Sequence, residues 1–173
     1  MVILGIDPGT ATTGWGIIKV NGTKLKVKNF ELIDYGCIVT MAKTPFPQRL
    51  GILRRDLRKL IFDKKPHVIC IEELFFGRNR KTAMTVSKAA GVIMEAAAST
   101  KIPIFEYQGF KVKHTLTGER FAGKAEIEKA VKRLLGKRKL TKPVNGFLDD
   151  AVDGIALAIY HAITLNPKLA SIC

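Results

Sequence analysis

The stretch VILGIDPGT, residues 2–10, sets a single carboxylate at the end of an otherwise apolar run. Residues 2–6 followed by Asp-Pro-Gly predict a buried strand that ends in a turn. A charged side chain on a buried strand is costly unless something compensates it, so Asp7 is a candidate functional residue. The alternative is that Asp7 only initiates the turn.

Two more strands are expected directly after this turn. Residues 14–20 form the second strand, and residues 24–39 supply the third. Asn21-Gly22 between them is a strong hairpin signal. Three successive strands joined by tight turns predict an antiparallel meander.

The hydrophobic pattern then changes to a helical period. Between residues 50 and 61, leucine and isoleucine recur at helical spacing opposite a basic face, and Pro66 is expected to end that helix. The remaining elements are expected in this order: a strand at 68–71, a long Ala-rich helix at 82–100, a strand at 103–107, a basic amphipathic helix at 124–135 and a last helix at 149–165.

This order predicts an α/β fold, with a mixed five-stranded sheet that has an antiparallel edge and is flanked by helices. A chain of 173 residues suits one domain, expected over residues 1–166, with 167–173 as a C-terminal tail. The start of the chain lacks the charged region of a signal peptide. The most apolar stretch, 89–98, is too short to cross a bilayer, so no membrane association is expected.

The charge balance points to an anionic partner. The chain has 29 Lys+Arg against 15 Asp+Glu, a formal net charge of +14. Nucleic acid is the commonest partner of such a surface, although a basic surface without a partner is the alternative. Three widely spaced cysteines, Cys37, Cys70 and Cys173, form no zinc-binding pattern and are expected to be reduced thiols of a cytosolic protein.

Three further carboxylates join Asp7 as candidates. Glu72 ends the apolar run VICI, and Asp150 and Asp153 lie three residues apart on the last helix, so they share a face. Asp149 precedes Asp153 by four residues and could join them. The alternatives are a Glu72–lysine pair and, for Asp149 and Asp150, charges favoured at a helix N-terminus.

Taken together, the acidic residues predict a metal-dependent nuclease. Oxygen ligands without a His/Cys set favour Mg²⁺, with Mn²⁺ as a substitute, over zinc. Two such ions about 4 Å apart can activate a water and stabilise the leaving oxygen of a phosphodiester. The surrounding lysines and arginines would then hold the nucleic acid backbone.

Three segments resemble the motifs of the RuvC family of Holliday junction resolvases. LGIDPGT at 4–10 with TGWG at 13–16 resembles the opening motif, IEELF at 71–75 the second, and DAVDGIA at 150–156 the last. The resemblance runs from residue 1 to about residue 163 with fitting intervals. It implies an RNase H-like fold and a homodimer that nicks two strands of a four-way DNA junction symmetrically, using Mg²⁺, with two ions expected per active site.

The resemblance also implies roles for particular residues. The metal-binding catalytic residues would be Asp7, Glu72, Asp150 and Asp153, although some family members have His at the position of Asp150. Lys113 would be a further catalytic residue. The DNA-binding residues would be Phe75, Arg78, Arg80, Lys111, Lys113 and Lys124.

Three of these DNA-binding assignments have alternatives in the sequence itself. Phe75 would stack on bases at the crossover, and the alternative is that Phe75 is a core side chain and Phe76 faces the DNA. Lys113 and Lys124 could be solvated charges. The segment 111–142 favours DNA binding, because its eleven Lys or Arg and three Glu give a local charge of +8.

The helix at 82–98 has Ala83, Ala90 and Ala97 at heptad spacing. The resemblance implies that this helix contributes to the dimer interface, and ordinary intramolecular packing is the alternative. It further implies a bacterial cytoplasmic location and cooperation with the branch-migration complex of RuvA and RuvB. His67, His114 and His161 form no cluster in the sequence, so structural or surface roles are expected for them.

Three rival functions remain open at this point. Asp-Pro-Gly-Thr also resembles the phosphate loop of actin-like ATPases and sugar kinases, but those proteins need two such domains. An RNase H-like nuclease that acts on RNA would keep the same fold. A non-catalytic DNA-binding module is disfavoured, because acids in a DNA-binding cleft repel phosphate unless metal is bound.

Overall fold

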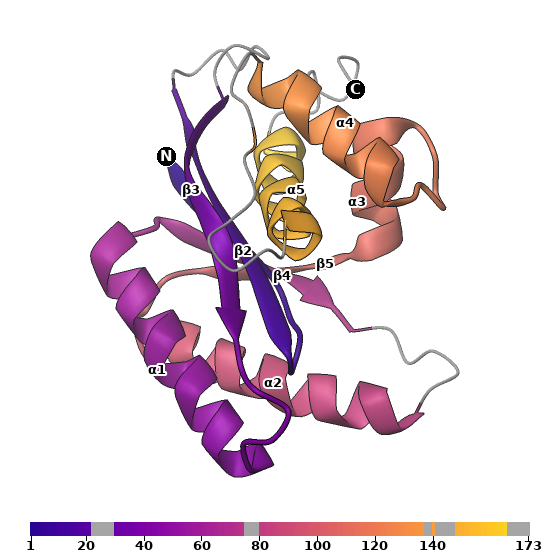
Figure 1. Cartoon of the computed structure of the whole chain (residues 1–173). Coiled ribbons are helices and arrows are strands. Elements are labelled where there is room, and N and C mark those ends of the chain that lie inside the picture. The colour runs from indigo at the N-terminus through magenta and orange to yellow at the C-terminus, as the bar shows by residue number, and fades with distance from the viewer. Residues whose placement is uncertain (22–29, 75–79, 137–139, 141–147, 166–173) are drawn as a thin grey trace.

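Five strands form one mixed sheet in the order β3-β2-β1-β4-β5 (Figure 1). The computed structural model describes residues 1–21, 30–74, 80–136, 140 and 148–165. The first three strands pair antiparallel, and β4 and β5 continue the sheet in parallel from β1. The predicted meander and mixed sheet are therefore confirmed. The strands span Val2–Asp7 (β1), Thr12–Val20 (β2), Phe30–Val39 (β3), Val68–Glu73 (β4) and Ile104–Gln108 (β5).

Helices cover both faces of this sheet. One face carries α1 and α2, and the other carries α3, α4 and α5, with α5 central on its face (Figure 1). Apolar strand residues alternate between the two resulting cores. The helices span Phe46–Lys64 (α1), Arg80–Ala98 (α2), Gly109–Thr117 (α3), Lys124–Leu135 (α4) and Leu148–Thr164 (α5).

Helix α3 was not expected, so the predicted order of three strands followed by helix, strand, helix, strand and two helices was short by one helix. It has nine residues and buries only Val112 and Leu116. A helix this short falls below the window of 11–18 residues in which helical periodicity is read. Its end is set by Gly118, which has a φ of 81° and donates its backbone N–H to the carbonyl oxygen of His114 at 2.9 Å.

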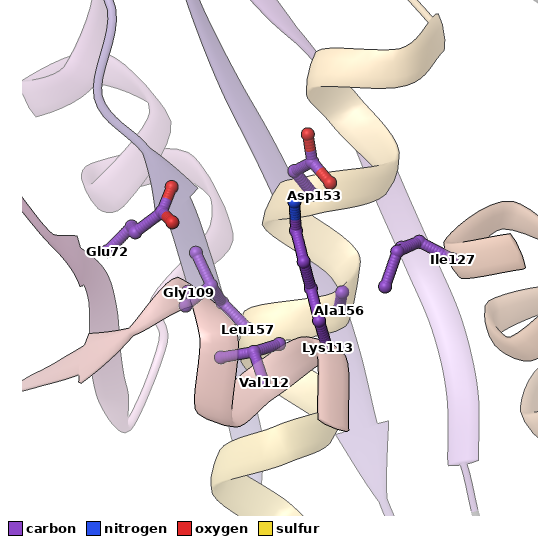
Figure 2. A pocket seen from close by; sticks show the side chains of 8 residues that line it. All are labelled: Glu72, Gly109, Val112, Lys113, Ile127, Asp153, Ala156 and Leu157. Carbon is purple, nitrogen blue, oxygen red and sulfur yellow. The ribbon is translucent and has the colours of Figure 1, made fainter. Parts of the chain in front are cut away.

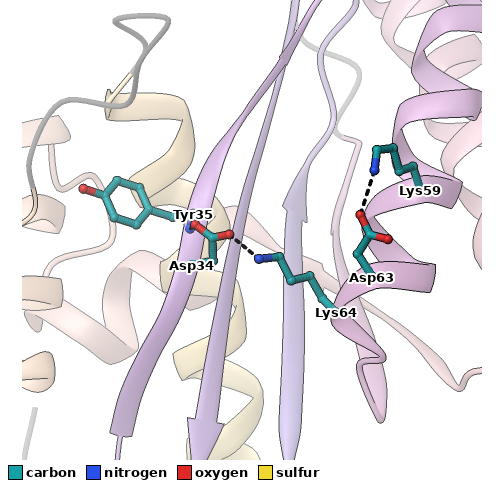
Figure 3. A network of polar contacts seen from close by, with 5 residues as sticks. All are labelled: Asp34, Tyr35, Lys59, Asp63 and Lys64. Atoms are coloured by element: carbon teal, nitrogen blue, oxygen red, sulfur yellow. Dashed lines mark hydrogen bonds and ion pairs between the residues drawn. The ribbon is translucent and has the colours of Figure 1, made fainter.

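One ion pair joins the C-terminus of α1 to the sheet (Figure 3). The ammonium group of Lys64 lies 2.5 Å from the carboxylate of Asp34 on β3, while Lys59 pairs with Asp63 within the helix at 3.0 Å. The helix ends at Lys64 because Lys65 takes a left-handed conformation, one residue before Pro66. None of the helices in the described ranges combines the length and the hydropathy needed to cross a membrane.

Two of the three heptad alanines of α2, Ala90 and Ala97, are used for packing within the chain, whereas Ala83 is only partly buried. Ala90 is 7% exposed, and Ala97 is completely buried beside Ile93 in the core under α1. At these two positions α2 therefore packs inside the chain itself, as the intramolecular alternative predicted. Any partner of α2 would have to meet its other, exposed side.

Helix α5 lies directly against β1 and β2 because glycines remove the side chains between them. A Cβ atom on Gly5 would overlap the carbonyl oxygen of Gly154, and one on Gly14 would overlap that of Asp150. A Cβ atom on Gly154 would come within 2.7 Å of the Cα atom of Trp15. This close approach fixes the first turns of α5 against the ends of the strands.

Candidate active site

Asp7 is the last residue of β1 and Glu72 the second-last residue of β4, so both lie where these two adjacent parallel strands end. Ile6 is in register with Ile71, so the next residue on each strand reaches the edge side by side. Burial raises the pKa of Asp7 well above its ordinary value, and the charge of Glu72 and a hydrogen bond between the two carboxyl groups raise it further. The carboxyl group of Asp7 is therefore harder to ionise than an ordinary aspartate in the absence of a counter-charge.

Asp150 and Asp153 approach the same point from α5. Their charges also raise the pKa of Asp7. Burial and the charge of Glu72 raise the pKa of Asp153 to about 6, against a partly opposing effect of nearby lysines. Two strand ends and one helix face thus bring four carboxylates within electrostatic reach of one another.

Lys113 extends from α3 toward Asp153, and the carboxylate of Glu72 faces the same cavity from β4 (Figure 2). The charge of Lys113 lowers the pKa of Asp153, which places the ammonium group close to that carboxylate. The cavity has a volume of about 70 Å³, and its remaining lining is mostly apolar, from Val112, Ile127, Ala156 and Leu157.

Lys124 begins α4 and reaches the rim of the site. Its ammonium group donates to the carboxylate of Asp149 at 3.4 Å, and both side chains are more than half exposed. Burial lowers the pKa of Lys124, but the hydrogen bond and the charges of Asp149, Asp150 and Asp153 outweigh it, so that the pKa is raised. Asp149 therefore pairs with Lys124 at the surface, whereas Asp150 and Asp153 lie close enough to Asp7 to raise its pKa.

The other expected DNA-binding residues are placed only in part. Lys111 is exposed on α3. Arg80 begins α2, but its side chain lies outside the described residues, as do Phe75, Phe76 and Arg78.

The histidines lie apart from the carboxylates. Nδ1 of His67 accepts the backbone N–H of Val2 at 3.0 Å. His161 is buried, with Nδ1 2.7 Å from the hydroxyl of Tyr107, and burial lowers its pKa. His114 is exposed on α3. These placements agree with the structural and surface roles expected from the sequence.

The oxygen donors of the four carboxylates are chemically suited to binding a divalent cation. Within the described part of the chain, no three His, Cys, Asp or Glu side chains already hold their donor atoms as an ion site. Asp7 is instead hydrogen-bonded to Glu72, and its pKa is raised by three neighbouring acids. A divalent cation would offset the repulsion among these acids, and oxygen donors are the ligands preferred by Mg²⁺ and Mn²⁺.

Sequence reasoning missed two features of this site. A Cβ atom on Gly109 would overlap Oε1 of Glu72, so the absence of a side chain there makes room for the carboxylate. A larger open cavity of about 620 Å³ adjoins Glu72 and Lys113 and is walled by Phe110, Arg120 and Phe121. An aromatic beside an arginine within the basic segment 111–142 is the sequence signal that could have found this wall.

Comparison with known proteins identifies relatives over nearly the whole chain. The family described as crossover junction endodeoxyribonuclease RuvC matches residues 3–161. The RuvC of Desulfitobacterium hafniense (strain DSM 10664 / DCB-2) is 43% identical over 166 residues, which cover 96% of this chain and 94% of that protein. The structure of Thermus thermophilus RuvC is similar with a TM-score of 0.81 and 28% identity, covering 97% of each chain. T. thermophilus RuvC in complex with a Holliday junction substrate gives the same TM-score at 27% identity and 96% coverage of each chain.

Proposed function

The chain belongs to the RuvC family of crossover junction endodeoxyribonucleases, and we propose that it resolves four-way DNA junctions at the carboxylate cluster of β1, β4 and α5. The family makes it a hydrolase of DNA phosphodiester bonds. The observation that supports placing the reaction at this cluster is that the charge of Glu72 raises the pKa of both Asp7 and Asp153, so three acids that lie far apart in the sequence lie close together in the fold.

Asp7, Glu72, Asp150 and Asp153 would hold the divalent metal. Mg²⁺ is the expected ion, with Mn²⁺ as a substitute and two ions per site. When bound, such ions supply an activated water and neutralise charge on the leaving oxygen. The carboxylates hold and orient the ions, and the apolar lining beside Glu72 and Lys113 limits the access of bulk water.

Lys113 would contact the scissile phosphate. Its ammonium group shares a cavity with Glu72 and Asp153, so it can stabilise negative charge that develops on the phosphate oxygens. Lys124 and Lys111 would hold the DNA backbone beside the site. Phe75 and Arg78, between β4 and α2, and Arg80, the first residue of α2, would contribute DNA contacts.

A homodimer would match the two equivalent strands of the junction. The exposed side of α2, opposite Ala90 and Ala97, is where a second copy would meet the chain. Cooperation with a RuvA–RuvB branch-migration complex in the bacterial cytoplasm would suit this function, and the bacterial origin of the relatives supports that location.

Cleavage of a synthetic four-way junction by the purified protein tests this function. With Mg²⁺, we expect symmetric nicks in the junction and little cutting of linear duplex. Equal cutting of an RNA–DNA hybrid would favour an RNase H-like nuclease that acts on RNA. Stabilisation by nucleotide without junction binding would favour a phosphotransferase instead.

A further inference from the structure

Phe121 presents its ring to solvent beside the proposed active site. It is 90% exposed, more than any other large apolar side chain in the described ranges, where Phe62 follows at 77%. Single exposed apolar residues are common on protein surfaces and need no partner. Phe121 is different because two further groups suited to binding a planar ring lie next to it.

Those groups are Arg120 and Phe110. The guanidinium carbon of Arg120 lies 4.4 Å from the centre of the Phe110 ring and 5.8 Å from the centre of the Phe121 ring. No ion pair between residues that the structure describes involves Arg120. Its charge is therefore held by aromatic faces rather than neutralised by a carboxylate.

A fixed turn holds this group in place. Gly118 ends α3 in a left-handed conformation, and the backbone N–H of Glu119 donates to Oγ1 of Thr117 at 3.0 Å. The same Oγ1 donates to the carbonyl oxygen of Lys113 at 2.7 Å. The chain therefore folds back along α3 and sets Arg120 over Phe110, the second residue of that helix.

The open cavity of about 620 Å³ connects this group to the carboxylates. Glu72, Gly109 and Lys113 line both this cavity and the smaller one at the metal site. A volume of this size is in the range of sites that bind small molecules, so it can hold one nucleotide. A strand with its scissile phosphate at Lys113 would place an adjoining base in this cavity.

We propose that Phe121 is a stacking platform for a nucleobase of the cleaved strand, and that Arg120, held by Phe110, contacts the phosphate next to that base. The inference rests on the proposed nuclease function of the same site. Stacking on a ring and contact with a phosphate do not distinguish one base from another, so this subsite accepts any base. Its role is to hold the strand in line with the carboxylates.

The test uses a four-way junction with the fluorescent base 2-aminopurine beside the cleaved phosphate. Without metal the strand stays intact, and stacking on Phe121 is expected to change the emission when the wild-type protein binds. Phe121→Ala is expected to lose this change and to bind roughly 5- to 150-fold more weakly. Phe121→Trp should retain both, and Phe62→Ala is the matched control, an exposed phenyl on α1.

Cleavage kinetics give an independent readout. Since Phe121 does not touch the reacting atoms, Phe121→Ala should raise KM while kcat stays within about twofold. Unchanged KM and unchanged fluorescence in this variant would overturn the subsite. A variant that loses only its dimeric mass in solution would overturn it too, because Phe121 would then belong to a protein interface.

The outcomes for the subsite and for the proposed function are separable. If the wild type and Phe121→Ala both cut junctions, with equal KM and equal emission, the nuclease function stands and the subsite is rejected. If the wild type binds the junction with the emission change but cuts no DNA, the subsite stands and the proposed function is rejected.

Discussion

The backbone of Gly109 lies so close to Oε1 of Glu72 that no side chain fits between them. We therefore expect Gly109→Ala to displace the Glu72 carboxylate. A displacement of about 1 Å in an active site can cost roughly 100-fold in rate, so cleavage should fall by about 10- to 100-fold while junction binding is retained. Single-turnover cleavage and gel-shift binding measure the two effects.

Gly51→Ala is the matched control for this variant. Gly51 lies on α1, and a Cβ atom added to it would meet nothing within 4 Å, so alanine should fit freely there. It should leave cleavage unchanged and raise the free energy of unfolding by roughly 0.5–1 kcal/mol, because glycine is a poor helix former. Equal cleavage by the Gly109 and Gly51 variants would mean that Glu72 needs no such space.

Asp7→Asn tests the centre of the carboxylate cluster. Asparagine keeps the shape of the side chain but removes the charge that a cation needs. Since bound metal contributes several kcal/mol to such a reaction, cleavage should fall by roughly 10³-fold or more, with junction binding kept. Asp63→Asn, an exposed acid on α1, should cut at the wild-type rate. Full cleavage by Asp7→Asn would remove Asp7 from the site.

Asp153→Asn is expected to stabilise the metal-free protein at high pH. The pKa of Asp153 is about 6 in the folded chain against an ordinary 3.8, so the folded state binds the proton more tightly. Stability is then lost as the pH rises from about 4 through about 6, the reverse of a salt-bridged aspartate. At about pH 8 the variant should gain a few degrees in Tm, since roughly 2–4 °C corresponds to 1 kcal/mol.

Thermal unfolding with a chelator present measures this gain. At about pH 3 the variant and the wild type should melt nearly together, because Asp153 is then mostly protonated in both the folded and the unfolded state. A loss of Tm at high pH would show that Asp153 is stabilised by Lys113 and Lys124 more than it is destabilised by burial and Glu72.

Mg²⁺ should stabilise the protein in a pH-dependent way. Protons compete with the cation for Asp7 and Asp153, whose pKa values are both raised. Saturating Mg²⁺ should therefore raise Tm clearly at about pH 8 and only slightly at about pH 5. The same increase in Tm at both pH values would mean that the cation binds away from Asp7 and Asp153. A chelator should abolish cleavage but leave junction binding unchanged.

Lys124→Ala tests the contact with the DNA backbone. If Lys124 touches one phosphate, its removal should weaken junction binding and reduce the slope of log affinity against log salt by about one unit. Lys59→Ala is the control, because Lys59 is also an exposed lysine paired with an aspartate, but it lies on α1. An unchanged slope for Lys124→Ala would mean that Lys124 pairs with Asp149 and contacts no phosphate.

The sequence predicted the sheet and the carboxylates because both follow from local patterns. Asp7 and Glu72 each directly follow an apolar run near the end of a strand, and parallel neighbours bring their ends to the same side of the sheet. Helix α3 escaped prediction because it buries only Val112 and Leu116. The stack of Arg120 on Phe110 depends on the left-handed turn at Gly118, so its two members meet through backbone geometry and not through sequence spacing.

The glycines between α5 and the first two strands make the geometry of the carboxylate cluster depend directly on how closely this helix packs on the sheet. Adding a single methyl group at Gly5, Gly14 or Gly154 would push the helix that carries Asp150 and Asp153 away from the strand that carries Asp7. Random variants at this seam should thus lose cleavage at temperatures where the rest of the molecule is still folded. Directed evolution toward higher thermal stability would therefore have to find its substitutions on the opposite face of the sheet, which α1 and α2 cover.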